Sequence, residues 1–335
     1  MKYQRTWIAA ALAAALLAAC GGSDPDIPGS GSPSGAPTTK GSFEAVVSFG
    51  DSLSDVGAYT PATQVPGTNP AVYFGGKFTT NNGTSSPVWV ENVATALGRV
   101  VTPHEVGFAG QSVKCQAAAN PALASTCTGY GQGGSRVTDP NGIGKTGGAL
   151  TVPVKTQIAN HLARFGSFKA SDLILVFGGN NDAFIQFGTF TATAQQIQAD
   201  AAAGRITPDQ ANQLLFRAQT VAQEAMKQAA LELAGYVKAE ILAKGGRYVA
   251  VVNLPDSTLT PFGSTLPASV KPVLTGLVDV FNLWLRDGLT GQPVQIVDFN
   301  AAARDTYLNP TKYGITNNLE PACSATKIAA ITGGR

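Results

Sequence analysis

Ser52 is the residue whose type and position most clearly suggest chemistry. It follows Gly50 and Asp51, directly after an apolar run that ends at Phe49. A serine in such a turn can act as a nucleophile, and backbone N–H groups of the turn can stabilise the negative charge of an acyl-transfer intermediate. The side-chain amide of Asn181, which follows another apolar run, would add an uncharged donor. Gly-Asp-Ser and Asn-Asp are also common turn sequences, so two ordinary tight turns are the alternative.

A serine nucleophile needs a base, and the chain has only two histidines. His104 follows Pro103 in a loop, and His161 lies in a helical pattern that indicates an ordinary position on a helix surface. Neither has an Asp three residues before it, and neither has a second ligand at metal-binding spacing. The sequence therefore predicts no metal site, and no catalytic His or Asp is found.

Four apolar runs rich in β-branched residues predict buried strands at residues 43–49, 173–177, 248–252 and 294–297. Helical patterns lie between them at 88–97, 152–165, 208–243 and 270–289. This alternation predicts an α/β fold, a three-layer α/β/α sandwich with a mainly parallel sheet. Because ligands bind at the carboxyl ends of parallel strands, Ser52 and Asn181 are expected at one edge of the sheet.

The longest predicted helix has a well-specified start. Thr207 can cap it, Pro208 suits the first turn, and Gln210 stands three residues after the cap. The Ala-rich segment 191–204 just before it has helical composition, which indicates an insertion or one helix of a hairpin. Glycine-rich loops are expected over 129–148.

Several short motifs, in order along the chain, resemble the sequence blocks of the GDSL or SGNH hydrolases, which are esterases and lipases. Residues 49–55, F-G-D-S-L-S-D, look like the first block. Residues 129–135, G-Y-G-Q-G-G-S, resemble the second block, N-Y-A-x-G-G-A, with Gly in place of Asn and Ala. Residues 179–182, G-N-N-D, match the third block, G-x-N-D, and 253–255, N-L-P, fall where the family often has that tripeptide. The resemblance covers residues 43 to about 323.

The resemblance implies an SGNH, flavodoxin-like fold and ester hydrolysis through an acyl-serine intermediate at Ser52. It implies an oxyanion hole formed by the Ser52 N–H, the Gly134 N–H and the Asn181 side chain, with Gly133 as the alternative to Gly134. The implied substrates are lipid or short-chain acyl esters, and no cofactor is implied. Residues 129–134 also fit the dinucleotide pattern G-x-G-x-x-G, but no apolar strand leads into them and Pro140 interrupts any following helix, so nucleotide binding is not predicted.

The last block of the family, Asp-x-x-His, has no counterpart in the sequence. We expect the chain to stop before a segment that holds this pair and a partner for Cys323.

Cys115 and Cys127 are expected to form a disulfide, since an exported protein, as the first residues predict below, can form one. Losing a triad member lowers rates by factors on the order of 10⁴ to 10⁶, so the alternative is a catalytically silent surface lipoprotein that uses the fold as a binding module.

The first residues predict export. Lys2 and Arg5 precede an apolar run over 7–19, too short to span a bilayer, and residues 17–20, L-A-A-C, resemble a lipobox in which Cys20 is lipidated. An ordinary signal peptide cut near an A-x-A site is the alternative. We expect a signal peptide over 1–19, a lipidated Cys20 with a flexible Gly/Ser/Pro linker to 42, and a hydrolase domain over 43–335.

Composition and charge limit the partners. The chain has 44% hydrophobic and 13% charged residues, which excludes a disordered or polytopic membrane protein. Lys and Arg number 23 against 21 Asp and Glu, and removing residues 1–19 takes away two of the basic residues and no acid. A neutral mature chain gives no electrostatic reason for nucleic-acid binding. We expect a monomer anchored by lipid at the outer membrane, in the periplasm or on the cell surface, with an acyl ester or lipid as substrate.

Overall fold

The computed structural model describes residues 43–63, 77 and 87–321. The predicted signal peptide, Cys20, the linker and Cys323 lie outside these residues. Within them, no helix is long and apolar enough to cross a membrane.

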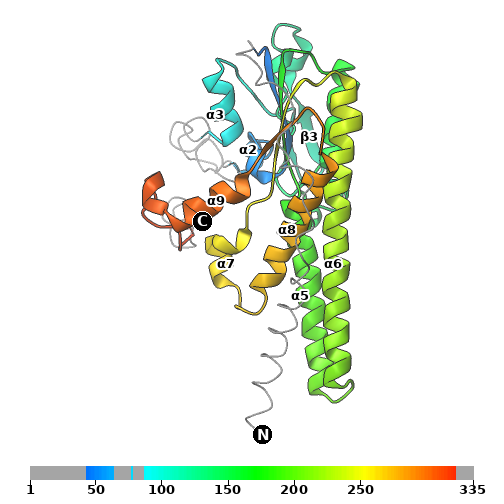
Figure 1. Ribbon diagram of the computed structural model, residues 1–335. Coiled ribbons are helices and arrows are strands. Elements are labelled where there is room, and N and C mark those ends of the chain that lie inside the picture. Colours follow the sequence, from blue (N-terminus) through cyan, green and yellow to red (C-terminus); the bar gives the residue numbers. More distant parts are fainter. Residues whose placement is uncertain (1–42, 64–76, 78–86, 322–335) are drawn as a thin grey trace.

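A four-stranded parallel sheet lies at the centre of the fold, in the order β1-β4-β5-β6 (Figure 1). Its strands are β1 (Ala45–Gly50), β4 (Asp172–Phe177), β5 (Tyr248–Val252) and β6 (Gln295–Val297). All three neighbouring pairs are parallel, which confirms the sheet predicted from the four apolar runs. The register pairs Gly50 with Phe177 and Val252 with Val297, so the carboxyl ends of the strands share one edge.

On its other side β1 pairs with the glycine-rich segment rather than with a regular strand. The Ser48 N–H donates to the Thr128 carbonyl at 2.9 Å, and the Tyr130 N–H donates back to Ser48 at 2.7 Å. The Gln132 N–H then reaches the Gly50 carbonyl at 3.2 Å. Residues 128–132 therefore run along β1 as far as its carboxyl end.

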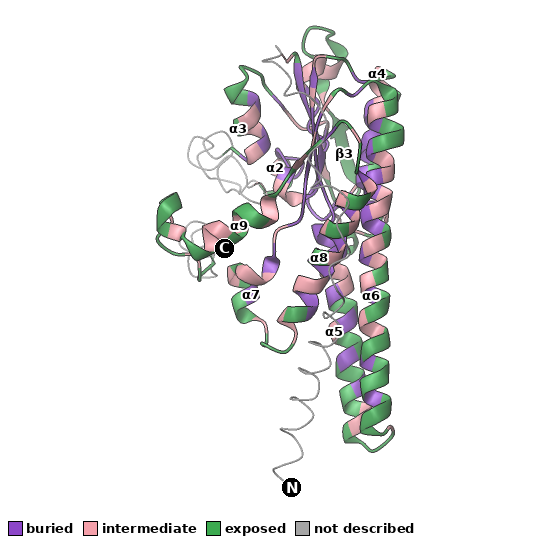
Figure 2. Cartoon of the chain, viewed as in Figure 1, coloured by how far each residue is buried: buried purple, intermediate pink, exposed green. Residues whose placement is uncertain are grey.

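Both faces of the sheet are covered, because residues of β1 alternate between two apolar clusters. Val47 and Phe49 belong to the larger cluster, which includes side chains of α4 (Val154–Phe165), α5 (Asn180–Ala202), α6 (Pro208–Tyr236) and α8 (Lys271–Gly288). Val46 belongs to the smaller cluster, beside α3 (Trp89–Ala96). Figure 2 shows the buried residues along the sheet and on the inner sides of these helices. The arrangement is compatible with a three-layer sandwich.

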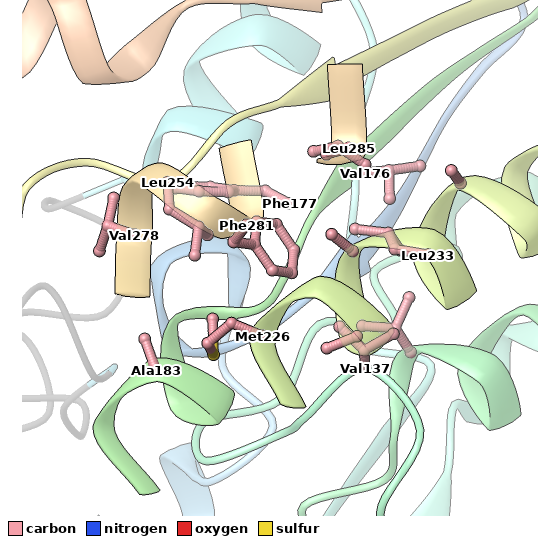
Figure 3. Packing of buried hydrophobic residues seen from close by; sticks show 14 of the residues in the cluster. Val137, Val176, Phe177, Ala183, Met226, Leu233, Leu254, Val278, Phe281 and Leu285 are labelled. Atoms are coloured by element: carbon pink, nitrogen blue, oxygen red, sulfur yellow. The ribbon is translucent and has the colours of Figure 1, made fainter. Parts of the chain in front are cut away.

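The larger cluster joins the sheet to the long helices. Phe281 of α8 is completely buried, and Figure 3 shows it beside Phe177 at the end of β4, with Met226 of α6 near by. Gly179 has a φ of 119°, and a Cβ there would lie 2.5 Å from the Phe281 ring. Close packing against this ring therefore requires glycine just before α5 begins.

Helices α5 and α6 pack on each other and extend as a hairpin beyond the sheet (Figure 1). The Thr207 hydroxyl accepts from the Gln210 N–H, and the Gln210 side chain accepts from the Thr207 N–H, which confirms the predicted start of α6. The segment predicted as helical over 191–204 is the second half of α5, which begins earlier, at Asn180. The long helix, predicted to reach residue 243, is α-helical only to Tyr236 and continues as a π-turn, Val237–Ile241, and a short 3₁₀ turn.

Smaller elements were not predicted. A hairpin of β2 (Glu105–Phe108) and β3 (Gln111–Lys114) turns at Ala109 and Gly110, both with positive φ. Its strands have four residues each, and β3 is fully exposed, so no apolar run marks them. Helix α9 (Phe299–Leu308) follows β6, and α2 (Thr60–Thr63) and α7 (Pro261–Thr265) are short helices in loops.

Candidate active site

The turn after β1 presents Ser52 at the carboxyl edge of the sheet. Ser52 begins a 3₁₀ turn, Ser52–Ser54, and is half-buried. Asp51, which is fully buried, caps this turn because its carboxylate accepts from the Leu53 N–H at 3.0 Å. Its second oxygen accepts from the Asn180 side chain at 2.9 Å, which links the turn to the start of α5.

The side chain of Gln157, on α4, bonds both backbone groups of Gly50, the last residue of β1. Its carboxamide oxygen accepts from the Gly50 N–H, and its nitrogen donates to the Gly50 and Val152 carbonyls, all at 2.8 Å. Gly50 must be glycine, because a Cβ would lie 2.2 Å from the Phe177 carbonyl oxygen. Gln157 was not predicted as a site residue from the sequence. The signal available in the sequence was helical spacing, which places Gln157 on the same face of the helix as Val154, Ile158 and His161.

The two candidate oxyanion glycines differ in their hydrogen bonds. The Gly133 N–H donates to Asp55 at 2.9 Å, and the other oxygen of that carboxylate accepts from the N–H groups of Gly57 and Ala58. The Gly134 N–H has no acceptor among the described residues, and neither has the Ser52 N–H. Of the two glycines, Gly134 is therefore the one whose backbone donor is available to a ligand.

Asn181 lies in the first turn of α5, beside the same loop. Its side-chain nitrogen donates to the Ser135 carbonyl at 2.8 Å and is buried. An amide nitrogen carries two hydrogens, so this bond leaves a second donor. Asp182 secures the loop further, accepting from the Arg136 side chain at 2.9 Å and from the Val137 N–H at 3.0 Å.

The three residues singled out in the sequence therefore lie on segments that are bonded to one another. Ser52 follows Asp51, which bonds Asn180. Asn181 bonds the residue after Gly134. This arrangement puts a hydroxyl, two backbone N–H groups and a side-chain amide at one edge of the sheet. Such a set can support nucleophilic attack on a carbonyl and stabilise the resulting oxyanion.

Burial controls the charge of the carboxyl groups beneath the site. It raises the pKa of Asp51 to about 6, against hydrogen bonds from Asn180 and Leu53 that lower it. It also raises the pKa of Asp55 to about 6, again against bonds from backbone N–H groups. These carboxyl groups therefore change their charge near pH 6, well above the range of an exposed aspartate.

The histidines lie in an aromatic cluster rather than at Ser52. His161 is buried, so the expectation of a position on a helix surface is wrong. Its Nδ1 lies 3.2 Å from the Tyr130 hydroxyl, and its ring stacks on Phe168. The His104 ring lies 4.5 Å from that of Tyr130. Burial lowers the pKa of His104 to about 4 and that of His161 to about 3. Neither contacts Ser52 within the described ranges.

The cysteine pair lies next to this cluster. Cys115 and Cys127 form a disulfide with their Cα atoms 5.9 Å apart. Cys127 is fully buried and directly precedes Thr128, which pairs with β1 and whose hydroxyl donates to the Val46 carbonyl at 2.7 Å. The disulfide therefore secures the start of the segment that ends at Gly134.

In the part of the chain that is described, no three His, Cys, Asp or Glu side chains are grouped to hold a metal ion. The chain matches no model of a known protein family, and comparison with curated proteins finds no match.

Proposed function

We propose that the protein is a serine ester hydrolase of the GDSL or SGNH type, with Ser52 as the nucleophile. The main support is that the N–H groups of Ser52 and Gly134 have no acceptor among the described residues and lie on segments that are bonded together beside Asn181. The proposed substrates are lipid or short-chain acyl esters. No cofactor enters the proposed reaction, and no nucleic-acid partner is proposed.

The proposed reaction begins when the Ser52 hydroxyl oxygen attacks the ester carbonyl carbon. The carbonyl π electrons move to oxygen, and the N–H groups of Ser52 and Gly134, with the Asn181 amide, stabilise that charge. Collapse of the intermediate expels the alcohol and leaves an acyl group on Ser52, which water then hydrolyses. Neither histidine touches Ser52 in the described region, so in the proposed reaction solvent water takes the Ser52 proton and the departing alcohol oxygen takes a proton from water. An oxyanion hole and substrate binding, without a base, typically accelerate the reaction by about 10³- to 10⁴-fold over the uncatalysed reaction in water.

The strand order supports the flavodoxin-like form of the fold that we propose. Residues 128–132 lie on one side of β1 and β4 lies on the other, so the chain order reverses at β1. Ligands of doubly wound sheets bind outside the carboxyl ends of the strands at such a reversal. Ser52 follows β1 and Asn181 follows β4, which are the two strands that flank this position.

The proposed location rests on residues 1–42 alone, because the positive charges, the apolar run and the L-A-A-C sequence are features of the sequence. We propose export, lipidation at Cys20 and a monomer tethered to the outer membrane, in the periplasm or at the cell surface. Lipid attachment would keep the domain near acyl esters of a membrane.

A second candidate function is a catalytically silent surface lipoprotein that binds ligands at the same edge of the sheet. The observation in its favour is that both histidines lie against Tyr130, His161 buried and His104 half-buried, where their lowered pKa values keep them neutral and their rings pack on aromatic neighbours. This candidate retains the donors of the site and requires no base.

A chromogenic short-chain ester assay with Ser52→Ala tests the proposal, together with mass spectrometry after treatment with a fluorophosphonate. We expect slow hydrolysis and slow covalent labelling by the full chain, because no histidine contacts Ser52 among the described residues, and we expect loss of both in Ser52→Ala. The matched control is Ser167→Ala, which changes an exposed serine in the turn after α4. Hydrolysis that survives Ser52→Ala would remove Ser52 as nucleophile. Ligand binding without hydrolysis or labelling would favour the silent binding protein.

A further inference from the structure

Three successive peptide units around Gly133 and Gly134 are each held by a different group. The Gly133 N–H donates to Asp55 at 2.9 Å, and the Gly134 carbonyl accepts from the Ile143 N–H at 2.9 Å. The peptide unit between them has one bond among the described residues, from the Tyr59 hydroxyl to the Gly133 carbonyl at 3.0 Å. The direction of this middle peptide therefore depends on Tyr59.

The direction of that peptide decides where the candidate oxyanion donor points. A trans peptide is planar, so the Gly133 carbonyl and the Gly134 N–H point in opposite directions. Glycine adopts positive and negative φ with similar ease, and Gly134 has a φ of 83°. Two adjacent glycines do not by themselves select one orientation of the plane between them. A hydrogen bond to the carbonyl does so, and thereby orients the N–H.

The same hydroxyl holds a strained residue that packs on Gly134. The Thr151 N–H donates to the Tyr59 hydroxyl at 3.0 Å. Thr151 is fully buried with a φ of 47°, a left-handed conformation that costs a β-branched residue about 1–3 kcal/mol. A Cβ on Gly134 would lie 2.8 Å from the Thr151 methyl group and 2.0 Å from the Ile143 carbonyl oxygen. The strained residue therefore closes one side of Gly134.

We propose that Tyr59 is a positioning residue that aims the Gly134 N–H into the oxyanion hole, an inference that rests on the proposed function. The hydroxyl acts by donating to the Gly133 carbonyl while it accepts from Thr151. Burial raises the pKa of Tyr59 to about 12, so the hydroxyl keeps its proton throughout the physiological range. Tyr59 does not touch the substrate in this role, and its loss should affect stabilisation of the oxyanion rather than substrate binding.

Tyr59→Phe tests the proposal because it removes the hydroxyl and keeps the ring. Loss of one oxyanion donor lowers kcat about 10²- to 10³-fold. We expect a fall of about 10- to 100-fold, since the freed peptide still samples the productive orientation, with KM within about twofold of the wild type. Crystal structures of the wild type and the variant should show the Gly133 carbonyl turned away from its original direction in the variant. Tyr248→Phe, at the start of β5, is the matched control and should leave kcat unchanged.

The crystal structures separate failure of this inference from failure of the proposed function. If the wild type hydrolyses no ester, the proposed function fails, and the peptide orientation still decides the role of Tyr59. An unchanged Gly133–Gly134 peptide in Tyr59→Phe overturns the inference, whether or not kcat falls.

A second variant covers the case in which Tyr59→Phe does not fold. Thr151→Gly suits a positive φ, removes the methyl group beside Gly134 and retains the N–H that bonds Tyr59. We expect the wild-type peptide orientation in its crystal structure, and wild-type kcat within about twofold. A turned peptide in Thr151→Gly would assign the orientation to the Thr151 side chain and contradict the proposal.

Discussion

The Asn180 side-chain nitrogen donates a hydrogen bond of 2.9 Å to the Asp51 carboxylate. Both residues are buried, and each directly precedes a residue of the proposed site, Ser52 in one case and Asn181 in the other. The bond therefore joins the turn that carries the proposed nucleophile to the helix that carries a proposed oxyanion donor. It also supplies a partner to a carboxylate that would otherwise be more costly to bury.

Asn180→Ala should destabilise the fold by about 1–3 kcal/mol, because it leaves a buried carboxylate oxygen without this donor. Urea unfolding measures the loss, and the ester assay should show a lower kcat because the turn at Ser52 is less firmly held. Asn212→Ala is the control, since Asn212 is an exposed residue of α6. Equal unfolding free energies for the two variants would show that the bond to Asp51 contributes nothing measurable.

The buried side chain of His161 predicts a loss of stability on acidification. The folded pKa of His161 is lowered to about 3 from an unfolded value of 6.5. Between these values the unfolded chain binds a proton that the folded chain does not, so this contribution is complete above pH 6.5 and declines as the pH falls. From pH 7 to pH 5 one such histidine removes about 2 kcal/mol. In His161→Phe, urea unfolding should show a correspondingly smaller change over this interval.

His161→Phe also loses its contact with Tyr130, which lowers its stability at every pH. The test is therefore the difference between pH 7 and pH 5 within each protein, compared between the two. The same pH dependence in wild type and variant would mean that His161 is not held neutral by burial.

The buried aspartates act in the opposite direction. The folded pKa of Asp55 is raised to about 6 from 3.8. Here the folded chain binds the extra proton, so the contribution is complete below pH 3.8 and is lost as the pH rises through 6. Wild type should lose about 1 kcal/mol from Asp55 between pH 5 and pH 7, while Asp55→Asn has no such group. If the difference in unfolding free energy between Asp55→Asn and the wild type is the same at pH 5 and pH 7, this assignment is contradicted.

The sequence predicted the centre of the fold because its signals there are local. The strands are continuous apolar runs, and Thr207, Pro208 and Gln210 together indicate the start of α6. The start of α5 was missed because Asn180 and Asn181 have turn-forming composition. Gly179, which precedes the helix, has a positive φ and packs against Phe281, a residue far away in the sequence.

The site was predictable only in part for the same reason. Ser52 comes shortly after β1 and Asn181 shortly after β4, so their position at the sheet edge could be inferred from the sequence. Tyr59 and Gln157 act through bonds that span 74 and 107 residues of sequence, to Gly133 and Gly50 respectively. No periodic pattern encodes such a partner. The burial of His161 was missed because its residue type indicated a surface position, although helical spacing places it on the same face of α4 as Val154 and Ile158.

The disulfide provides the last test, because it joins the β2–β3 hairpin to the segment that leads to Gly134. Cys115 and Cys127 are separated by 12 positions in the sequence, and closing a loop of this length contributes about 3 kcal/mol by the chain-entropy model. A reducing agent should lower the Tm of the wild type and leave that of the double variant Cys115→Ser/Cys127→Ser unchanged. The reduced wild type and the double variant should also have similar unfolding free energies. Alkylation should first show that the thiols of the reduced wild type are free. If the Tm is then unchanged by reduction, the hydrogen bonds of Thr128 and Tyr130 to β1 hold this segment without the disulfide.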